Sequence, residues 1–282
     1  MKASSFLGAI VVFVILLSLV SSTLTLTLPY SFSQQNFSSK VTVEYEVRKA
    51  EAPEAKIVSI ELAASTGGIT LEAVDDPELA YKVVFRYSPS VEPPKVSQTV
   101  SGETLIFSAE RLMGSAEILL GPAYTYRLDI SLVNGGFKAE LDGNCRVESL
   151  TLKVNSGGVA LKIATGASLK KADIEITSGG LTLKFDAGSL GCDSKIKARV
   201  GSGGVMVPPV RVGPSVGLKF KVKVASGGIS LNDEGLEVLR LTKSECIAAT
   251  SNYDSARVRG DIEIYVEDGG VALNSSLPLP SL

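Results

Sequence analysis

Apolar and polar residues alternate along most of the chain, and a pair of glycines interrupts the alternation at regular intervals. The phrase ITSGGLTL (176–183) is one example, and similar phrases recur throughout the sequence. Successive pairs are 68, 22, 22, 24, 24 and 42 residues apart, so the spacing clusters near 22 or near its multiples. Such a period indicates a repeat architecture in which each unit packs against its neighbours. The first glycines of the pairs are Gly67, Gly135, Gly157, Gly179, Gly203, Gly227 and Gly269.

Aligning the repeats on the first glycine reveals four columns that hold only apolar residues. Around Gly179 these columns hold Ile174 and Ile176 before the pair, and Leu181 and Leu183 after it. Alternation on both sides predicts two half-buried strands in each repeat. The residue just before the pair is always Ser, Thr, Asn or Asp, which favours a bend. We therefore interpret each pair as a structural corner, where glycine permits a positive φ or a close backbone approach.

Two all-β folds fit this pattern. In a parallel β-solenoid, each repeat of about 22 residues forms one rung, and equivalent residues stack about 4.8 Å apart. In an antiparallel meander, the glycine pairs would be hairpin turns. We favour the solenoid, because stacking explains why each column keeps its residue type. Weaker repeats near Val83, Ser101 and Leu236 would fill the long intervals and give about ten rungs.

The N-terminal residues predict export across a membrane. An apolar run from Phe6 to Val20 is broken only by Ser18, a weakly polar stretch extends it to Leu28, and only Lys2 is charged before it. One cation before an apolar run places the rest of the chain on the outer face of the membrane. The run up to Val20 suits a signal peptide, whereas the run up to Leu28 could span a bilayer. We favour an uncleaved, single-pass anchor because no A-x-A-like cleavage site follows; cleavage would instead release a secreted protein.

The chain therefore divides into four predicted segments. Two Asn-x-Ser sequences, at Asn36 and Asn274, are candidate N-glycosylation sites of an exported protein. The segments are a membrane anchor or signal peptide in 1–30, a stalk or capping strand in 31–56, the repeat domain in 57–275 and a tail in 276–282.

The composition narrows the classes of function. The 28 Lys and Arg are balanced by 30 Asp and Glu, so no basic stripe indicates a nucleic-acid partner. Histidine is absent, which removes the commonest general base and most zinc or copper ligand sets, and we expect no cofactor. Cys145, Cys192 and Cys246 have no metal-like spacing. The first two fall in similar columns two rungs apart, roughly 10 Å, so the solenoid predicts no disulfide between them.

Outward-facing positions are where an interaction site would lie. The columns four and six residues before the glycine pair are charged in consecutive repeats, acidic in one rung and basic in the next two, and Lys219 extends this ladder. This ladder is either a solvated strand face or a patch for acidic glycans, anionic lipid headgroups or a partner protein. Binding at such a patch would weaken with salt. The candidate residues are Lys153, Glu175, Lys197, Arg199, Lys219, Lys221 and Lys223.

Two adjacent carboxylate pairs, Asp75-Asp76 and Asp233-Glu234, are the candidates for other chemistry. A glycoside hydrolase needs two carboxylates that flank one bond, and carboxylates also bind calcium. Both pairs follow an apolar residue at the end of a predicted strand, where an acidic turn is ordinary. We therefore predict no catalytic residue and no metal site.

The repeated S-G-G-aliphatic-x-aliphatic unit, its period near 22 and the single preceding apolar segment resemble the putative-adhesin family, also called toastrack domains. The resemblance covers roughly residues 56 to 275, and several family members carry SG-Asp or SGS where this chain has a second glycine. It implies a single-layered β-solenoid outside the membrane, tied to surface attachment or envelope stress sensing, without a catalytic motif. We thus expect a non-enzymatic, membrane-anchored surface protein for adhesion or envelope assembly, with surface glycans or envelope proteins as partners. A stress-sensing ectodomain and a polysaccharide-active enzyme are the alternatives.

Overall fold

A computed structural model describes residues 40–186, 188 and 190–274. These residues form thirteen β-strands and two 3-10 turns, η1 (Lys49–Glu51) and η2 (Tyr253–Ser255), and they contain no α-helix. The predicted anchor and the first part of the predicted stalk lie outside them. The strands are β1 (Val41–Arg48), β2 (Ile57–Ala73), β3 (Leu79–Tyr87), β4 (Lys95–Ser101), β5 (Thr104–Leu120), β6 (Thr125–Leu141), β7 (Arg146–Ile163), β8 (Ser168–Phe185), β9 (Ser194–Val207), β10 (Val216–Leu231), β11 (Leu236–Leu241), β12 (Glu245–Thr250) and β13 (Val258–Leu273).

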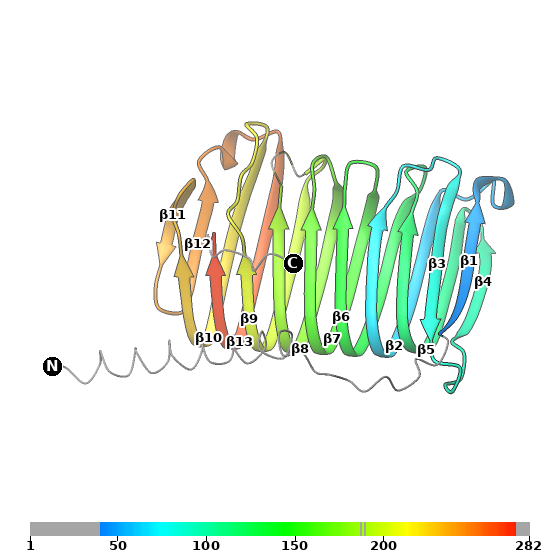
Figure 1. The fold of residues 1–282 in the computed structure, drawn as a ribbon. Coiled ribbons are helices and arrows are strands. Elements are labelled where there is room, and N and C mark those ends of the chain that lie inside the picture. The colour runs from blue at the N-terminus through cyan, green and yellow to red at the C-terminus, as the bar shows by residue number, and fades with distance from the viewer. Residues whose placement is uncertain (1–39, 187, 189, 275–282) are drawn as a thin grey trace. The chain divides into compact units, whose positions relative to one another are not determined.

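Eight of the strands are long, and each folds back on itself at a glycine (Figure 1). We call the part before the glycine the first arm and the part after it the second arm; the two arms face each other and run in opposite directions. Seven of these strands carry the predicted glycine pairs, and β5 bends at Gly114, which is followed by Ser115 instead of a second glycine.

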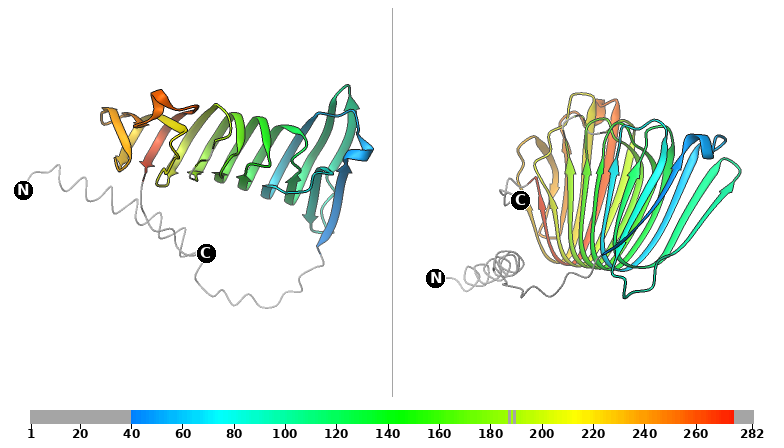
Figure 2. Two further views of the ribbon diagram at one scale, coloured as in Figure 1. Left: turned by 90° about the horizontal axis from the view of Figure 1, so that it is seen from above. Right: turned by 45° about the vertical axis from the view of Figure 1, so that its right-hand side comes forward.

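The long strands stack in parallel and in register. The two further views in Figure 2 show these strands side by side along the stack. Gly157 of β7 lies beside Gly179 of β8, which in turn lies beside Gly203 of β9. Parallel pairing of neighbouring repeats is what a β-solenoid requires and a meander lacks. The preferred fold is therefore confirmed, with one continuous bent strand where the sequence predicted two strands and a corner.

The order of the strands differs from their order in the sequence at both ends of the stack. The eight long strands stack as β5-β2-β6-β7-β8-β9-β13-β10. The prediction of about ten sequential rungs is therefore wrong for the described residues. The weak repeats near Val83 and Leu236 form β3 and β11, which pair antiparallel with their neighbours. The segment after Ser101 forms β5, which stacks on the outer side of β2 and not between β2 and β6.

The short antiparallel strands cover the two ends of the stack. At the β5 end, β4 pairs with the first arm of β5, β3 pairs with its second arm, and β1 adds to β3. At the β10 end, β12 pairs with Lys219–Lys223 in the first arm of β10, and β11 adds to β12. None of these five short strands contains a glycine, the residue at which each long strand folds back, so none forms a full rung.

The core lies between the first and second arms. The four apolar columns point into this space: Ile174, Ile176, Leu181 and Leu183 of β8 are each at most 3% exposed. The same columns are buried in the other long strands that carry a glycine pair, except in the second arm of β10. Alternate residues along each arm point outward and carry the charged side chains, in the outward columns that the alternation predicts.

The first glycine of each pair is required by the stacking. Gly179 has a φ of +143°, and a Cβ atom there would lie 1.7 Å from the carbonyl oxygen of Gly157 in the next rung. The second glycine is not required on steric grounds, because a Cβ atom on Gly180 would approach only the carbonyl oxygen of Gly204, at 3.7 Å. The column of first glycines with positive φ comprises Gly67, Gly135, Gly157, Gly179, Gly203, Gly227 and Gly269.

Candidate interaction face

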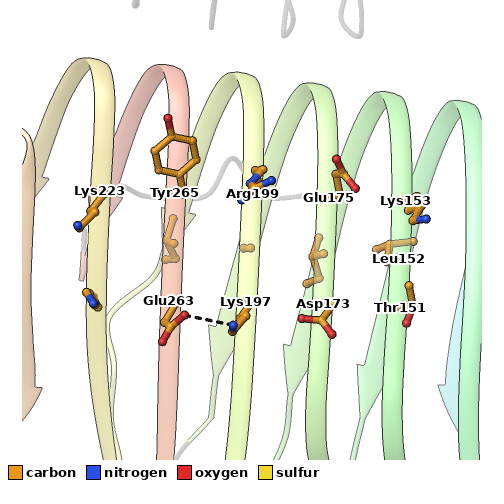
Figure 3. A pocket seen from close by; sticks show the side chains of 14 residues that line it. Thr151, Leu152, Lys153, Asp173, Glu175, Lys197, Arg199, Lys223, Glu263 and Tyr265 are labelled. Carbon is orange, nitrogen blue, oxygen red and sulfur yellow. Dashed lines mark ion pairs between the residues drawn. The ribbon is translucent and has the colours of Figure 1, made fainter.

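The predicted charged ladder lies on the outer face of the first arms of β7, β8, β9 and β10. Its side chains alternate with buried residues; Lys197 and Arg199, for example, flank the buried Ala198. Six of the seven predicted residues are exposed, and Lys219 is half-buried. The structure therefore brings the predicted side chains onto one surface, in strands that lie side by side (Figure 3).

The order of charges along this surface differs from the prediction, because β13 lies between β9 and β10. Glu263 of β13 is in register with Lys197 on one side and Lys221 on the other. Tyr265 is in register with Arg199 and Lys223 in the same way. The two basic rungs that the sequence placed next to each other are thus separated by an acidic and aromatic rung.

The sequence-based prediction missed Glu263 and Tyr265, although a signal for them was present. They occupy the columns six and four residues before Gly269, the same columns that supplied the rest of the ladder. The predicted ladder follows the order of the sequence and ends at β10, whereas the return of β13 into the stack is a property of the tertiary structure.

Ion pairs and cation–π contacts cross this surface between neighbouring strands. Lys197 Nζ lies 3.8 Å from Glu263 Oε2, and the guanidinium carbon of Arg199 lies 5.9 Å from the centre of the Tyr265 ring. Lys223 Nζ lies 3.7 Å from an oxygen of Glu245 in β12. The three cations are exposed, whereas the Glu245 side chain is only 18% exposed. Contacts made by exposed cations are worth about 1 kcal/mol or less, so these cations keep much of their capacity to bind an external anion.

A shallow groove of about 420 Å³ runs across this face (Figure 3). Its lining holds five cations and three anions, a net charge of +2 (5 − 3), and Tyr265 stands between Lys223 and Arg199 with 38% of its surface exposed. A groove that combines cations, carboxylates and an exposed aromatic ring suits a polar, anionic ligand. The lining residues are Thr151, Leu152, Lys153, Asp173, Ile174, Glu175, Lys197, Ala198, Arg199, Lys221, Lys223, Glu263, Ile264 and Tyr265.

A second aromatic side chain lies near the start of the same strands. The Tyr253 hydroxyl donates a hydrogen bond of 2.7 Å to Asp261 Oδ1, and Lys219 Nζ lies 5.5 Å from the centre of its ring. Burial and this hydrogen bond raise the pKa of Tyr253 to about 12. Lys219 is therefore held against Tyr253, outside the groove, and the predicted ladder splits into a groove set and this separate contact.

The remaining candidates do not join this face. Asp76 lies in the turn before β3 and forms an ion pair with Arg48 at the end of β1. Asp233 lies in the turn before β11. The two carboxylate pairs thus lie toward opposite ends of the stack and cannot flank one bond. Within the described residues, no cluster of three or more Cys, Asp or Glu side chains could hold a metal ion.

The two candidate glycosylation sites have different outcomes. Asn36 lies outside the described residues. Asn274 is 2% exposed, and its Nδ2 atom donates hydrogen bonds to the carbonyl oxygens of Asn232 (2.9 Å) and Glu234 (2.7 Å). Because a glycan would be attached to that nitrogen, the folded chain leaves no room for one, and the prediction at Asn274 is revised.

The three cysteines are free thiols in the structure. Ser168 stands between the positions of Cys145 and Cys192, with its hydroxyl 3.2 Å from the Cys192 sulfur and its backbone N–H bonded to the Cys145 carbonyl. The separation of these two cysteines by two rungs, which the repeat predicts, is therefore confirmed. Burial raises the pKa of the Cys145 thiol to about 12.

No helix in the part of the chain that the structure describes is long and apolar enough to cross a membrane. The run from Phe6 to Leu28, on which the anchor prediction rests, lies outside that part. The anchor therefore stays a prediction.

Comparison with known proteins supports the fold. No protein-family model and no curated protein matches the chain. The crystal structure of a putative cell adhesion protein from Clostridium sporogenes ATCC 15579 is similar, with a TM-score of 0.57, 16% sequence identity, and coverage of 83% of this chain and 99% of that one. A putative adhesin from Bacteroides fragilis NCTC 9343 is 10% identical over 83% of this chain and 97% of its own, with a TM-score of 0.21. The resemblance expected from the sequence is thus confirmed for the fold: the chain has the β-solenoid architecture of a protein described as a putative cell adhesion protein.

Proposed function

We propose that this chain is a non-enzymatic, membrane-anchored surface protein that attaches to anionic glycans through the groove on its first arms. The observation that carries the proposal is the position of Tyr265 between Arg199 and Lys223, in a groove of net positive charge. Adhesion also fits the fold shared with a protein described in those terms. The anchor and the extracytoplasmic location come from the apolar N-terminal run and belong to the proposal.

The chemistry of the groove matches that of an acidic polysaccharide. The guanidinium of Arg199 can donate two parallel hydrogen bonds to a uronate carboxylate or a sulfate, and a lysine contributes a point charge. The exposed ring of Tyr265 offers an apolar face to the C–H groups of a sugar and a hydroxyl to its oxygens. Asp173, Glu175 and Glu263 can accept hydrogen bonds from sugar hydroxyls.

The repeat also suits a polymer better than a single sugar. Neighbouring rungs present charged side chains about 4.8 Å apart, so one glycan chain can contact several rungs at once. Each contact is weak, but linked contacts raise the overall affinity without any new interaction.

Binding of the purified full chain to immobilised polyuronate, with neutral dextran as the reference polymer, tests this function. We expect the wild type to bind polyuronate and not dextran. The double variant Arg199→Glu/Lys223→Glu should bind polyuronate with an affinity at least about tenfold lower, because two attractive charges become repulsive. Added salt should weaken the wild-type interaction. Tyr265→Ala should also weaken it, with less change in its salt dependence.

The matched control is Lys138→Glu, which reverses an exposed lysine on the second arm of β6, away from the groove. It changes the net charge in the same direction and should leave polyuronate binding close to that of the wild type. An equal loss in this control would mean that only the overall charge matters. Binding to dextran as strong as to polyuronate would contradict the anionic ligand.

A further inference from the structure

The β10 end of the stack has the form of a step. The first arm of β10 is extended by two more strands, β12 and β11. The second arm, residues 226–231, pairs with β13 on one side, and no described strand pairs with its other side. At the opposite end, β4 and β3 cover both arms of β5. The β10 end is therefore the incompletely covered end of the described stack.

Two strand edges are free at this step among the described residues. One is the outer edge of residues 226–231 in β10, and the other is the outer edge of β11, which pairs only with β12. β11 is six residues long, the same length as the free part of β10. Free edges expose unpaired backbone N–H and C=O groups, which are templates for pairing with another strand.

Apolar side chains are exposed beside both free edges. Ile229 and Leu231 are only half-buried, whereas their equivalents in the other strands with a glycine pair are buried. Val238 and Leu241 of β11 are 38% and 54% exposed. They pair with Ala248 and Cys246, which are buried, so these β11 side chains face the space between the arms. That space is open here, because the second-arm side of the described stack stops at β10.

The step is complementary to a second copy of itself. β11 runs parallel to the first arm of β10, since both are antiparallel to β12, and so it runs opposite to the second arm. Rotation of a second copy by 180° about an axis parallel to the strands places its β11 antiparallel to residues 226–231 of the first copy. The same rotation places β11 of the first copy beside the second copy's free edge. Each two-strand extension then fills the other copy's step.

We propose that the chain forms a symmetric dimer through this step, in which β11 of each copy pairs with the second arm of β10 of the other. This dimer is independent of the glycan-binding groove, which lies on the outer face of the first arms. A two-fold interface of this kind is isologous and closed, so it yields dimers and not fibres. The end face, about 20 Å along the strands and two sheets deep, would bury roughly 1,000 Å² in total, near the lower limit of specific interfaces.

The opposite end of the stack is unsuited to the same role, which argues against head-to-tail stacking. β4 is polar and begins with a lysine directly after Pro93 and Pro94, and β1 carries Glu44 and Glu46 on an edge strand. Charged residues and prolines are the usual protection of an edge against pairing with another chain.

Sedimentation equilibrium of the full chain in density-matched detergent tests the dimer, because it reports the protein mass alone. We expect a concentration-dependent rise to twice the 29.5 kDa of one chain. The double variant Val238→Lys/Leu241→Lys should remain at the mass of one chain at concentrations at least about tenfold above the wild-type midpoint. Val100→Lys, at a similarly exposed apolar position on β4 at the other end, should dimerise like the wild type.

Amide hydrogen exchange of the wild type provides a second readout that needs no substitution. Residues 226–231 and 236–241 should become more protected as the concentration rises through the dimerisation range. A wild type that stays at one chain mass would overturn the proposal, and concentration-independent protection would then identify a segment of the same chain as the cover. A dimer that survives Val238→Lys/Leu241→Lys, or open polymers disrupted by Val100→Lys, would contradict it as well.

Discussion

The centre of the stack and its ends are built from the same repeat but are specified differently. From β6 to β9 the strands stack in sequence order, and their columns continue from one strand to the next, with one register shift beside Tyr126 and Arg127 between β6 and β7. At the ends the order inverts: β2 lies inside β5, and β13 lies inside β10. The repeat motif alone fixes the centre, because every central rung is equivalent, whereas the ends need additional information about which rung is outermost.

At the β10 end, charge supplies part of that information. If β10 followed β9 directly, the glycine register would place Lys197 opposite Lys221 and Arg199 opposite Lys223. Like charges directly across neighbouring strands destabilise a sheet, and opposite charges stabilise it. β13 instead contributes Glu263 and Tyr265 to both neighbours. The inverted order therefore replaces two repulsive pairs by attractive ones.

The largest expected effect separates the glycines of the centre from those of the end. Gly179→Ala should cost about 2–6 kcal/mol of unfolding free energy, because strain at a positive φ and a backbone clash each cost about 1–3 kcal/mol. Gly227→Ala should cost less, about 1–3 kcal/mol, although its Cβ atom would lie 1.6 Å from Gly269 O. The second arm of β10 has no described strand on its outer side and can move away. Denaturant unfolding of both variants measures the difference.

Gly180→Ala is the control for this pair, because its Cβ atom would make only an ordinary contact, 3.7 Å from Gly204 O. It should change stability by less than about 1 kcal/mol. Equal losses in Gly179→Ala and Gly180→Ala would show that the pair is required as a unit, and equal losses in Gly179→Ala and Gly227→Ala would show that centre and end are equally rigid.

An intermediate effect is expected from the strand that inverts the order at the β10 end. Glu263→Lys converts opposite-charge neighbours on β9 and β10 into like-charge neighbours. The unfolding free energy should fall by about 1–2 kcal/mol at low salt. Thermal unfolding at low and high salt measures the loss, which should shrink as salt screens the charges. Unchanged stability of Glu263→Lys at both salt concentrations would remove charge as the reason for the inverted strand order.

Glu61→Lys is the matched control in the same column. Its neighbours in register are Ser108 and Asp129, so the same substitution there creates no like-charge pair and removes one. It should leave stability unchanged or raise it. A loss equal to that of Glu263→Lys would mean that a lysine in this column is unfavourable whatever its neighbours are.

The smallest expected effect concerns a buried thiol in the centre. Burial raises the pKa of Cys145 from its ordinary value of 9.0 to about 12. The contribution of this thiol to the unfolding free energy is fully present below pH 9 and is lost as the pH rises toward 12, because the thiol of the unfolded chain releases its proton at a lower pH. Between about pH 8 and about pH 10 the folded state should lose about 1 kcal/mol from this group.

Cys145→Ala should flatten this alkaline slope, whatever its effect on stability at neutral pH. Unfolding free energies measured from about pH 7 to about pH 10 give the slope. Cys192→Ala is the control, because it removes the other cysteine from a similar position two rungs away. A slope unchanged by Cys145→Ala would show that the thiol titrates as it does in the unfolded chain.

Much of the candidate site could be predicted from the sequence, because the outward columns follow from alternation. The alternation predicts one shared face for four cations, and the structure places them there: Lys197, Arg199, Lys221 and Lys223. Tyr265 completes the groove but was missed, since its strand is separated from β10 in the sequence by β11 and β12.

Asn274 shows the same limit of local patterns. Its Asn-x-Ser triplet can be recognised from three consecutive residues, whereas its burial depends on hydrogen bonds to Asn232 and Glu234, which follow a different strand. Solvent access to a side chain is a property of the packed structure, so the triplet could not report it.

The sequence by itself determined the rung. Alternation set which side chains are buried, and the first glycine of each pair set where the strand bends, because only glycine fits a positive φ beside a neighbouring backbone oxygen. Only the tertiary structure decided the order of the rungs at the ends, the antiparallel strands that cover them and the step left open beside β10. The physical reason is that a repeat makes all rungs nearly interchangeable neighbours, so the choice among them depends on contacts between residues far apart in the chain.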